Sequence, residues 1–71
     1  MEKYIKNILR GMTAQELATA CTYERSGTRN MFTEELCRRA GLLRPYRSAC
    51  EDRNAREVVD RAARSFGILL I

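Results

Sequence analysis

The sequence contains no histidine, and its three cysteines form no CxxC pair. Without histidine, neither a Ser/His nor a Cys/His relay for nucleophilic catalysis can be assembled. The chain also lacks the P-loop and GxGxxG patterns that hold phosphates. A zinc site would need a fourth ligand that the cysteines do not supply. We therefore expect a non-enzymatic protein with no catalytic residues, no metal site and no cofactor.

Long apolar runs are also missing. The longest uninterrupted one, residues 68–71 (ILLI), is far too short to span a bilayer. The first eleven residues, MEKYIKNILRG, have no long apolar segment of the kind that signal peptides carry. An odd number of cysteines without a framework spacing argues against a disulfide-stapled secreted domain. We expect a cytoplasmic protein with reduced thiols and no membrane partner.

The composition that remains is that of a small globular domain. The chain has 71 residues, of which 45% are hydrophobic and 31% charged, so residues 1–71 form one domain with one small core. The formal net charge is +4. Its basic excess lies in the middle of the chain, where residues 24–47 carry six arginines against three glutamates. Because arginine binds phosphates and carboxylates alike, the pattern indicates a nucleic-acid partner or an acidic protein surface.

Hydrophobic spacing predicts the first two helices. Residues 2–10 place apolar side chains on one helical face, and Gly11 is a plausible end. The second helix has a capping box, in which Thr13 and Glu16 each satisfy a free backbone N–H at the helix start. Its apolar stripe runs to Cys21.

Two further helices are expected after residue 27. The third begins within residues 28–30 and ends at residue 40, where Gly41 and Leu42 fit a Schellman ending. Pro45 is expected to prevent its continuation. The last helix has two possible starts, a capping box at residues 48–51 and a looser one at residues 54–57. Phe66 is expected on its buried face, and Gly67 is expected to end it. No segment of usable length alternates with period 2, so the fold class is all-α, a small domain of three to four helices.

The apolar C-terminal residues, Ile68 to Ile71, have two interpretations. Folding back onto a core that is short of apolar mass is favoured, because small domains need such area. Docking onto a second copy, which would make a homodimer, is the alternative.

The stretch TAQELATACTYERSGTRNMFTEELCRRAGLLRPY carries a family resemblance. A T-x-x-E-L-A positioning helix, a turn and a helix that closes on L-x-x-x-G-L-L are found in winged-helix and related helix-turn-helix DNA-binding domains, which residues 5–44 resemble. Two features depart from that pattern, since Thr22 stands where the turn usually has glycine and no wing hairpin fits between residues 43 and 48. An ordinary pair of antiparallel helices joined by a polar loop is the alternative.

The resemblance implies a DNA interface. Ser26, Thr28, Arg29 and Asn30 would begin the recognition helix. Arg29 or Asn30 would face base edges, because arginine suits guanine and asparagine suits adenine. The residues expected to hold the phosphate backbone are Arg25, Arg44 and Arg47.

Two functions follow as hypotheses. The leading one is a small non-catalytic transcription regulator that binds duplex DNA through this helix pair and its arginine cluster. The alternative is a small protein-binding regulator or inhibitor of the phage-encoded kind. It would dock its basic face on an acidic surface of a larger machine, such as RNA polymerase or a nuclease complex. The cysteines are interpreted as small apolar core residues.

Overall fold

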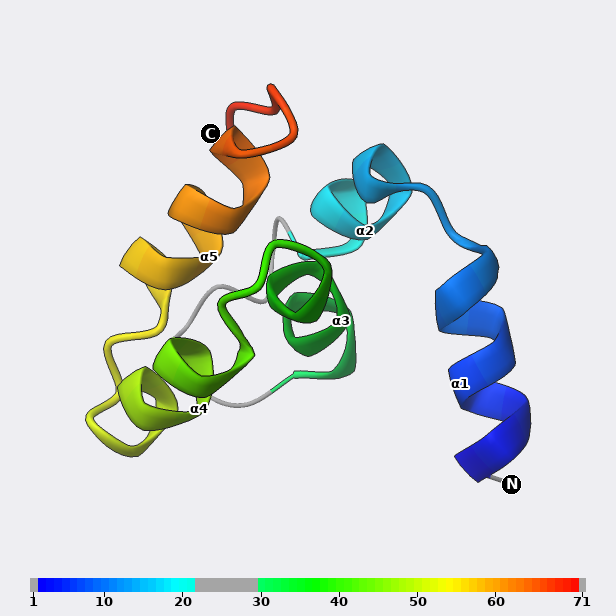
Figure 1. The fold of residues 1–71 in the computed structure, drawn as a ribbon, viewed down its shortest axis with the longest axis horizontal. Coiled ribbons are helices and arrows are strands. Elements are labelled where there is room, and N and C mark those ends of the chain that lie inside the picture. The colour runs from blue at the N-terminus through cyan, green and yellow to red at the C-terminus, as the bar shows by residue number, and fades with distance from the viewer. Residues whose placement is uncertain (1, 22–29, 71) are drawn as a thin grey trace.

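The computed structural model describes residues 2–21 and 30–70 (Figure 1). The predicted all-α class is confirmed, because the described residues form helices and no strand. They comprise five helices, in the order α1 (Glu2–Gly11), α2 (Ala14–Cys21), α3 (Met31–Arg39), α4 (Leu43–Glu51) and α5 (Arg56–Arg64). None of these helices has the length and apolar character that crossing a membrane requires.

Helix α3 lies at the centre of the fold and contacts each of the other four helices (Figure 1). Its Leu36 and Cys37 side chains are completely buried. The core around them is supplied mostly by α2, α4 and α5 and includes Leu17, Ala18, Cys21, Tyr46, Val59, Ala62 and Ala63. The side of α3 that the other helices leave open still carries exposed side chains, among them Met31 and Arg38.

The predicted start of α2 is confirmed by its hydrogen bonds. The Thr13 backbone N–H donates to Glu16 Oε1 over 2.9 Å, and the Glu16 N–H donates to Thr13 Oγ1 over 3.0 Å. This reciprocal pair satisfies two N–H groups that have no partner within the helix. Only two residues separate the end of α1 from the start of α2.

The predicted glycine endings are also confirmed. Gly41 has a φ of +74°, and the next N–H, from Leu42, donates to the Cys37 carbonyl over 2.8 Å. Gly67 has a φ of +75° and plays the same part at the end of α5. Both turns are Schellman motifs, in which the left-handed residue lets the chain cover the last helical carbonyls.

The third helix ends before Pro45, as predicted, but Pro45 lies inside a further helix, α4, that was not predicted. Pro45 lies in the first turn of α4, where its missing N–H would have no partner within the helix anyway. Ser48, expected as a helix cap, is therefore inside α4. Of the two starts predicted for the last helix, the one at residues 54–57 is the better one, since α5 begins at Arg56.

The end of α4 explains why this helix escaped prediction. The Asn54 N–H donates to the Ala49 carbonyl over 2.8 Å, which is the same Schellman closure as in the other two helices. The left-handed residue here is Arg53, with a φ of +54°, and it is not a glycine. An arginine in this conformation gives no recognisable end signal in a sequence.

The C-terminal residues divide between core and solvent. Ile68 and Leu70 pack against the core, as the favoured interpretation expected, whereas Leu69 is 79% exposed. Phe66, expected on the buried face of the last helix, is instead 41% exposed. It lies beyond the last helical residue, Arg64, where the chain has left the helical path. The homodimer stays a prediction.

Candidate functional site

The residues expected to begin a recognition helix are only partly described. Arg25, Ser26, Thr28 and Arg29 lie outside the described residues. Asn30 is the N-cap of α3, with its side-chain oxygen accepting the N–H groups of Phe32 and Thr33 over 2.8 and 3.3 Å. That oxygen is therefore engaged in beginning the helix.

A buried hydroxyl network fixes this first turn of α3 against α4. The Tyr46 side chain is completely buried, and its hydroxyl accepts the Asn30 backbone N–H over 2.9 Å. The hydroxyls of Tyr46 and Thr33 also share a hydrogen bond. Burial is the main cause that raises the pKa of Tyr46 to about 12, so the phenol stays protonated at neutral pH. The start of α3 is thus turned toward the protein interior at Thr33, which is 1% exposed.

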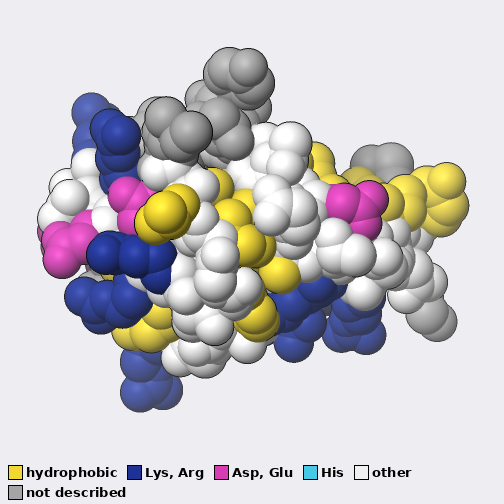
Figure 2. All heavy atoms as spheres, turned by 90° about the horizontal axis from the view of Figure 1, so that it is seen from above, with side chains coloured by type: hydrophobic (Ala, Val, Ile, Leu, Met, Phe, Trp, Pro, Cys, Tyr) yellow, Lys and Arg dark blue, Asp and Glu magenta, His cyan; other side chains and the backbone are white. Residues whose placement is uncertain are grey.

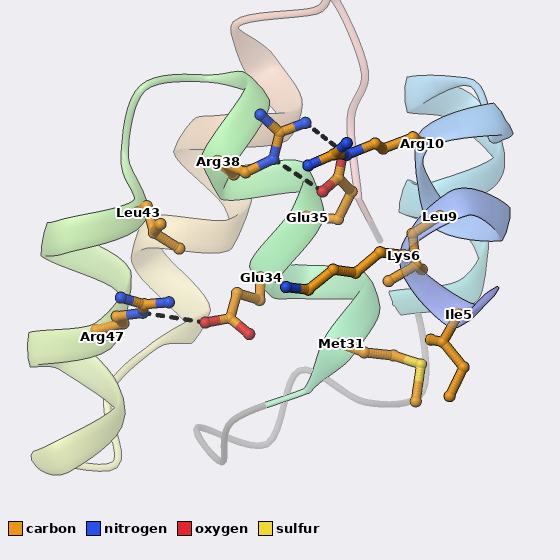
Figure 3. Close-up of a pocket in the computed structure, with 10 residues that line it drawn as sticks. All are labelled: Ile5, Lys6, Leu9, Arg10, Met31, Glu34, Glu35, Arg38, Leu43 and Arg47. Carbon is orange, nitrogen blue, oxygen red and sulfur yellow. Dashed lines mark hydrogen bonds and ion pairs between the residues drawn. The ribbon is translucent and has the colours of Figure 1, made fainter. Parts of the chain in front are cut away.

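The two predicted arginines of α4 are exposed. Arg44 and Arg47 are one turn apart, so they lie on the same side of the helix. The Arg47 Nε lies 3.0 Å from Glu34 Oε1 on α3, and its side chain is still 54% exposed (Figure 3). The structure therefore brings Arg44 and Arg47 together, beside a surface hollow that the sequence did not reveal.

This hollow is a groove of about 570 Å³ between α1 and α4, with α3 as its floor (Figure 3). We call it the α1–α4 groove. It is lined by Ile5, Lys6, Leu9, Arg10, Met31, Glu34, Glu35, Arg38, Leu43 and Arg47. Residues far apart in the chain meet here, so no local sequence signal could have identified it.

The lining of the α1–α4 groove is net positive. It contains four cationic side chains and two carboxylates, from Glu34 and Glu35. Lys6 extends from α1 toward Glu34 (Figure 3). Because two carboxylates cannot neutralise four cations, the groove attracts negative charge. Its other residues are apolar, so it also offers a hydrophobic surface.

Glu35, in the groove lining, forms ion pairs with two arginines of α3. It is 8% exposed, and its Oε2 lies 2.7 Å from Arg38 Nη2 and 2.9 Å from Arg39 Nε. The hydrogen bond from Arg38 is the largest cause that lowers the pKa of Glu35 to about 2, with a further contribution from Arg39. Arg39 Nη2 also donates to the carbonyls of Leu9 and Arg10, over 2.7 and 3.2 Å. Glu35 and Arg39 thereby fasten the end of α1 to α3.

Exposed apolar side chains continue from the groove along α1. Tyr4 is 70% exposed, Ile8 is 49% exposed, and Met31 at the start of α3 is 48% exposed. Figure 2 shows hydrophobic side chains at the surface of the molecule where α1 lies. Basic side chains at the opposite end, near α5, are mixed with acidic ones (Figure 2). The α1 side therefore combines exposed apolar area with the net positive charge of the groove lining.

The cysteines occupy core positions. Cys21 and Cys37 are buried and Cys50 is partly buried, all three as free thiols. Burial raises the pKa of Cys37 to about 12, which keeps this thiol protonated and unreactive despite the neighbouring arginines. Among the residues that the structure describes, no group of three or more acidic or cysteine side chains is placed to hold a metal ion.

No protein-family model, curated protein or solved structure matches this chain.

Proposed function

We propose that this chain is a small non-catalytic regulator that binds another protein through its basic side, formed by the α1–α4 groove and the adjoining Arg44 and Arg47. Among our two sequence-based hypotheses, this is the one that the geometry favours. The observation that carries it is the α1–α4 groove, whose lining combines four cationic side chains with four apolar ones. A recognition helix presents its N-terminal residues to base edges in the major groove, whereas the first turn of α3 buries Thr33 against Tyr46 of α4.

The first turn of α3 supports the same conclusion. Thr33 is buried, and the Asn30 side-chain oxygen is engaged as a helix cap. Reading adenine takes both the oxygen and the NH₂ group of an asparagine, so base contact by Asn30 would undo the cap. The apolar part of the α1–α4 groove also suits a protein surface better than a phosphate backbone, which offers charge and little apolar area.

The proposal is tested by capture of a partner from lysate of the source cells with the tagged chain. We expect one protein to be retained in stoichiometric amount, and the double variant Arg44→Ala/Arg47→Ala to lose most of it. Both side chains are exposed, so the variant should keep its helical circular dichroism spectrum. Capture of no stoichiometric protein, or an intact complex with the double variant, contradicts the proposal.

Duplex DNA remains the second candidate partner. The net charge of +4 and the exposed Arg44 and Arg47 favour it, together with the sequence resemblance of residues 5–44. DNA binding predicts a log–log salt dependence of about one unit per phosphate contact. It also predicts that Arg29→Ala changes the preferred sequence. Duplex binding with both properties would replace a protein partner as the proposed function.

A further inference from the structure

We infer that the α1–α4 groove receives an acidic amphipathic helix of the partner protein. This inference rests on the proposed function, to which it adds the site and the chemistry of the docking segment. The occupant would bury apolar side chains against the groove and place carboxylates beside Lys6 and Arg10 of α1.

The α1–α4 groove offers exposed apolar side chains to an occupant. Met31 is 48% exposed at the mouth of the groove, and Ile5 and Leu43 line its two sides. Ile8 extends the apolar surface along α1. A single row of apolar side chains, spaced as on one face of a helix, can cover these positions at once. An extended phosphate chain has no group that benefits from covering them.

Two cations of α1 are spaced to meet carboxylates on one side of a docking helix. Lys6 and Arg10 are four residues apart on α1, which places their Cβ atoms about 6 Å apart on one side of the helix. Carboxylates at positions i and i+4 of a docking helix have the same spacing. In the groove lining, Glu34 and Glu35 are already bonded to Arg47 and Arg38. The excess positive charge of the lining is therefore left for the occupant.

A second copy of this chain is a poorer occupant than an acidic partner. Each copy carries a net charge of +4, so two copies repel one another. The acidic side chains of α5 are interleaved with Arg56, Arg61 and Arg64. Charge complementarity therefore favours a segment rich in Glu and Asp from a different protein.

The test is a titration of the ¹⁵N-labelled chain with a designed peptide of about 15 residues, long enough to form helix on docking. The peptide carries Leu at i, i+3, i+4 and i+7 and Glu pairs at i,i+4 on the flanks. A peptide of identical composition in scrambled order is the control. We expect saturable amide shifts at Ile5, Leu9, Met31 and Leu43 with the amphipathic peptide alone.

Two double variants of the chain distinguish the effect of charge in the groove from the effect of the net charge on peptide binding. Lys6→Gln/Arg10→Gln should weaken peptide binding about tenfold, through two lost charge pairs of about 0.7 kcal/mol each. The matched variant Arg56→Gln/Arg64→Gln removes the same charge from α5 and should leave binding nearly unchanged. Equal weakening by both variants, equal binding of the scrambled peptide, or an absence of saturable shifts at the groove would overturn the inference.

Capture from lysate shows whether only the groove is wrong as the docking site or whether the proposed function itself is wrong. A partner that is retained by Lys6→Gln/Arg10→Gln but lost by Arg44→Ala/Arg47→Ala keeps the proposed function and rejects the groove as its site. Loss of the partner with both double variants supports docking along the whole side. Capture of nothing by the unchanged chain rejects the proposed function itself.

Discussion

Helix α1 and the α2–α5 bundle are held in place by different forces. The bundle surrounds α3 with completely buried side chains such as Leu36 and Tyr46. Of the α1 side chains whose exposure the structure describes, Leu9 alone is buried, and Ile8 on its apolar face is half exposed. Ile5 and Leu9 pack α1 on the core, and the guanidinium of Arg39 holds its end by donating to two of its carbonyls.

Within this small domain, the α2–α5 bundle therefore supplies most of the folding stability, while α1 presents surface to a partner. Apolar area that is removed from water stabilises the bundle, at about 25 cal/mol per Å². The apolar area that α1 leaves exposed contributes little to folding and is available to a partner. An amphipathic helix at the edge of a small domain can therefore be regular in sequence and still be incompletely covered.

The largest expected difference in stability is between alanine substitutions of an apolar side chain in the bundle and of one in α1. Leu36→Ala is expected to cost about 3 kcal/mol, because it leaves a cavity in a completely buried site. Ile8→Ala, at a half-exposed position, should cost about 0.5 kcal/mol or less. Urea denaturation followed by circular dichroism measures both. Similar costs at the two positions would show that α1 is packed as tightly as the bundle.

Removing the charge of Glu35 should loosen α1 in preference to the bundle. Glu35→Gln is expected to cost about 2 kcal/mol at pH 7, because Arg38 and Arg39 lose their carboxylate. Amide exchange should accelerate in α1 more than in α5. Exposed Glu57, which lies 3.8 Å from Arg61, provides the matched control in Glu57→Gln, with an expected cost near zero.

The pH dependence of that cost follows from the lowered pKa of Glu35. The folded-state pKa of about 2 lies below the ordinary value of 4.5, so the carboxylate stabilises the fold fully above pH 4.5. This contribution disappears as pH falls from 4.5 through about 2. The stabilities of the unchanged chain and Glu35→Gln should therefore converge over that range. A difference that stays constant down to pH 2 would contradict the assigned ion pairs.

The smallest expected effect is a gain in the free energy of unfolding, from a substitution at the end of α4 in the bundle. Arg53→Gly should raise the free energy of unfolding by about 0.5–1 kcal/mol, because glycine adopts a φ of +54° without the steric cost that arginine carries. Arg53→Ala removes the same charge but keeps a Cβ, so it should leave stability nearly unchanged. Peptide binding at the α1–α4 groove should be the same in all three proteins. Equal stabilisation by alanine would assign the effect to charge.

The sequence alone determined the features that depend on neighbours within one or two turns. The capping box of Thr13 and Glu16 and the glycine endings at Gly41 and Gly67 were predicted because each is closed by hydrogen bonds over three to five residues. The apolar periodicity of the helices before residue 42 was equally local. Helix α4 was missed because its proline lies in a tolerated position and its left-handed end is an arginine.

Only the tertiary structure decided which surfaces these helices share. Arg44 and Arg47 were predicted, with Arg25, to hold a phosphate backbone, but the α1–α4 groove beside them joins side chains from residue 5 to residue 47. Arg39 reaches the Leu9 carbonyl thirty residues earlier in the chain. Such contacts depend on how α1 and α4 pack on α3, and packing geometry leaves no periodic trace in a sequence. The chain thus specified its helices locally, while the meeting of apolar and basic groups in one groove arose from their assembly.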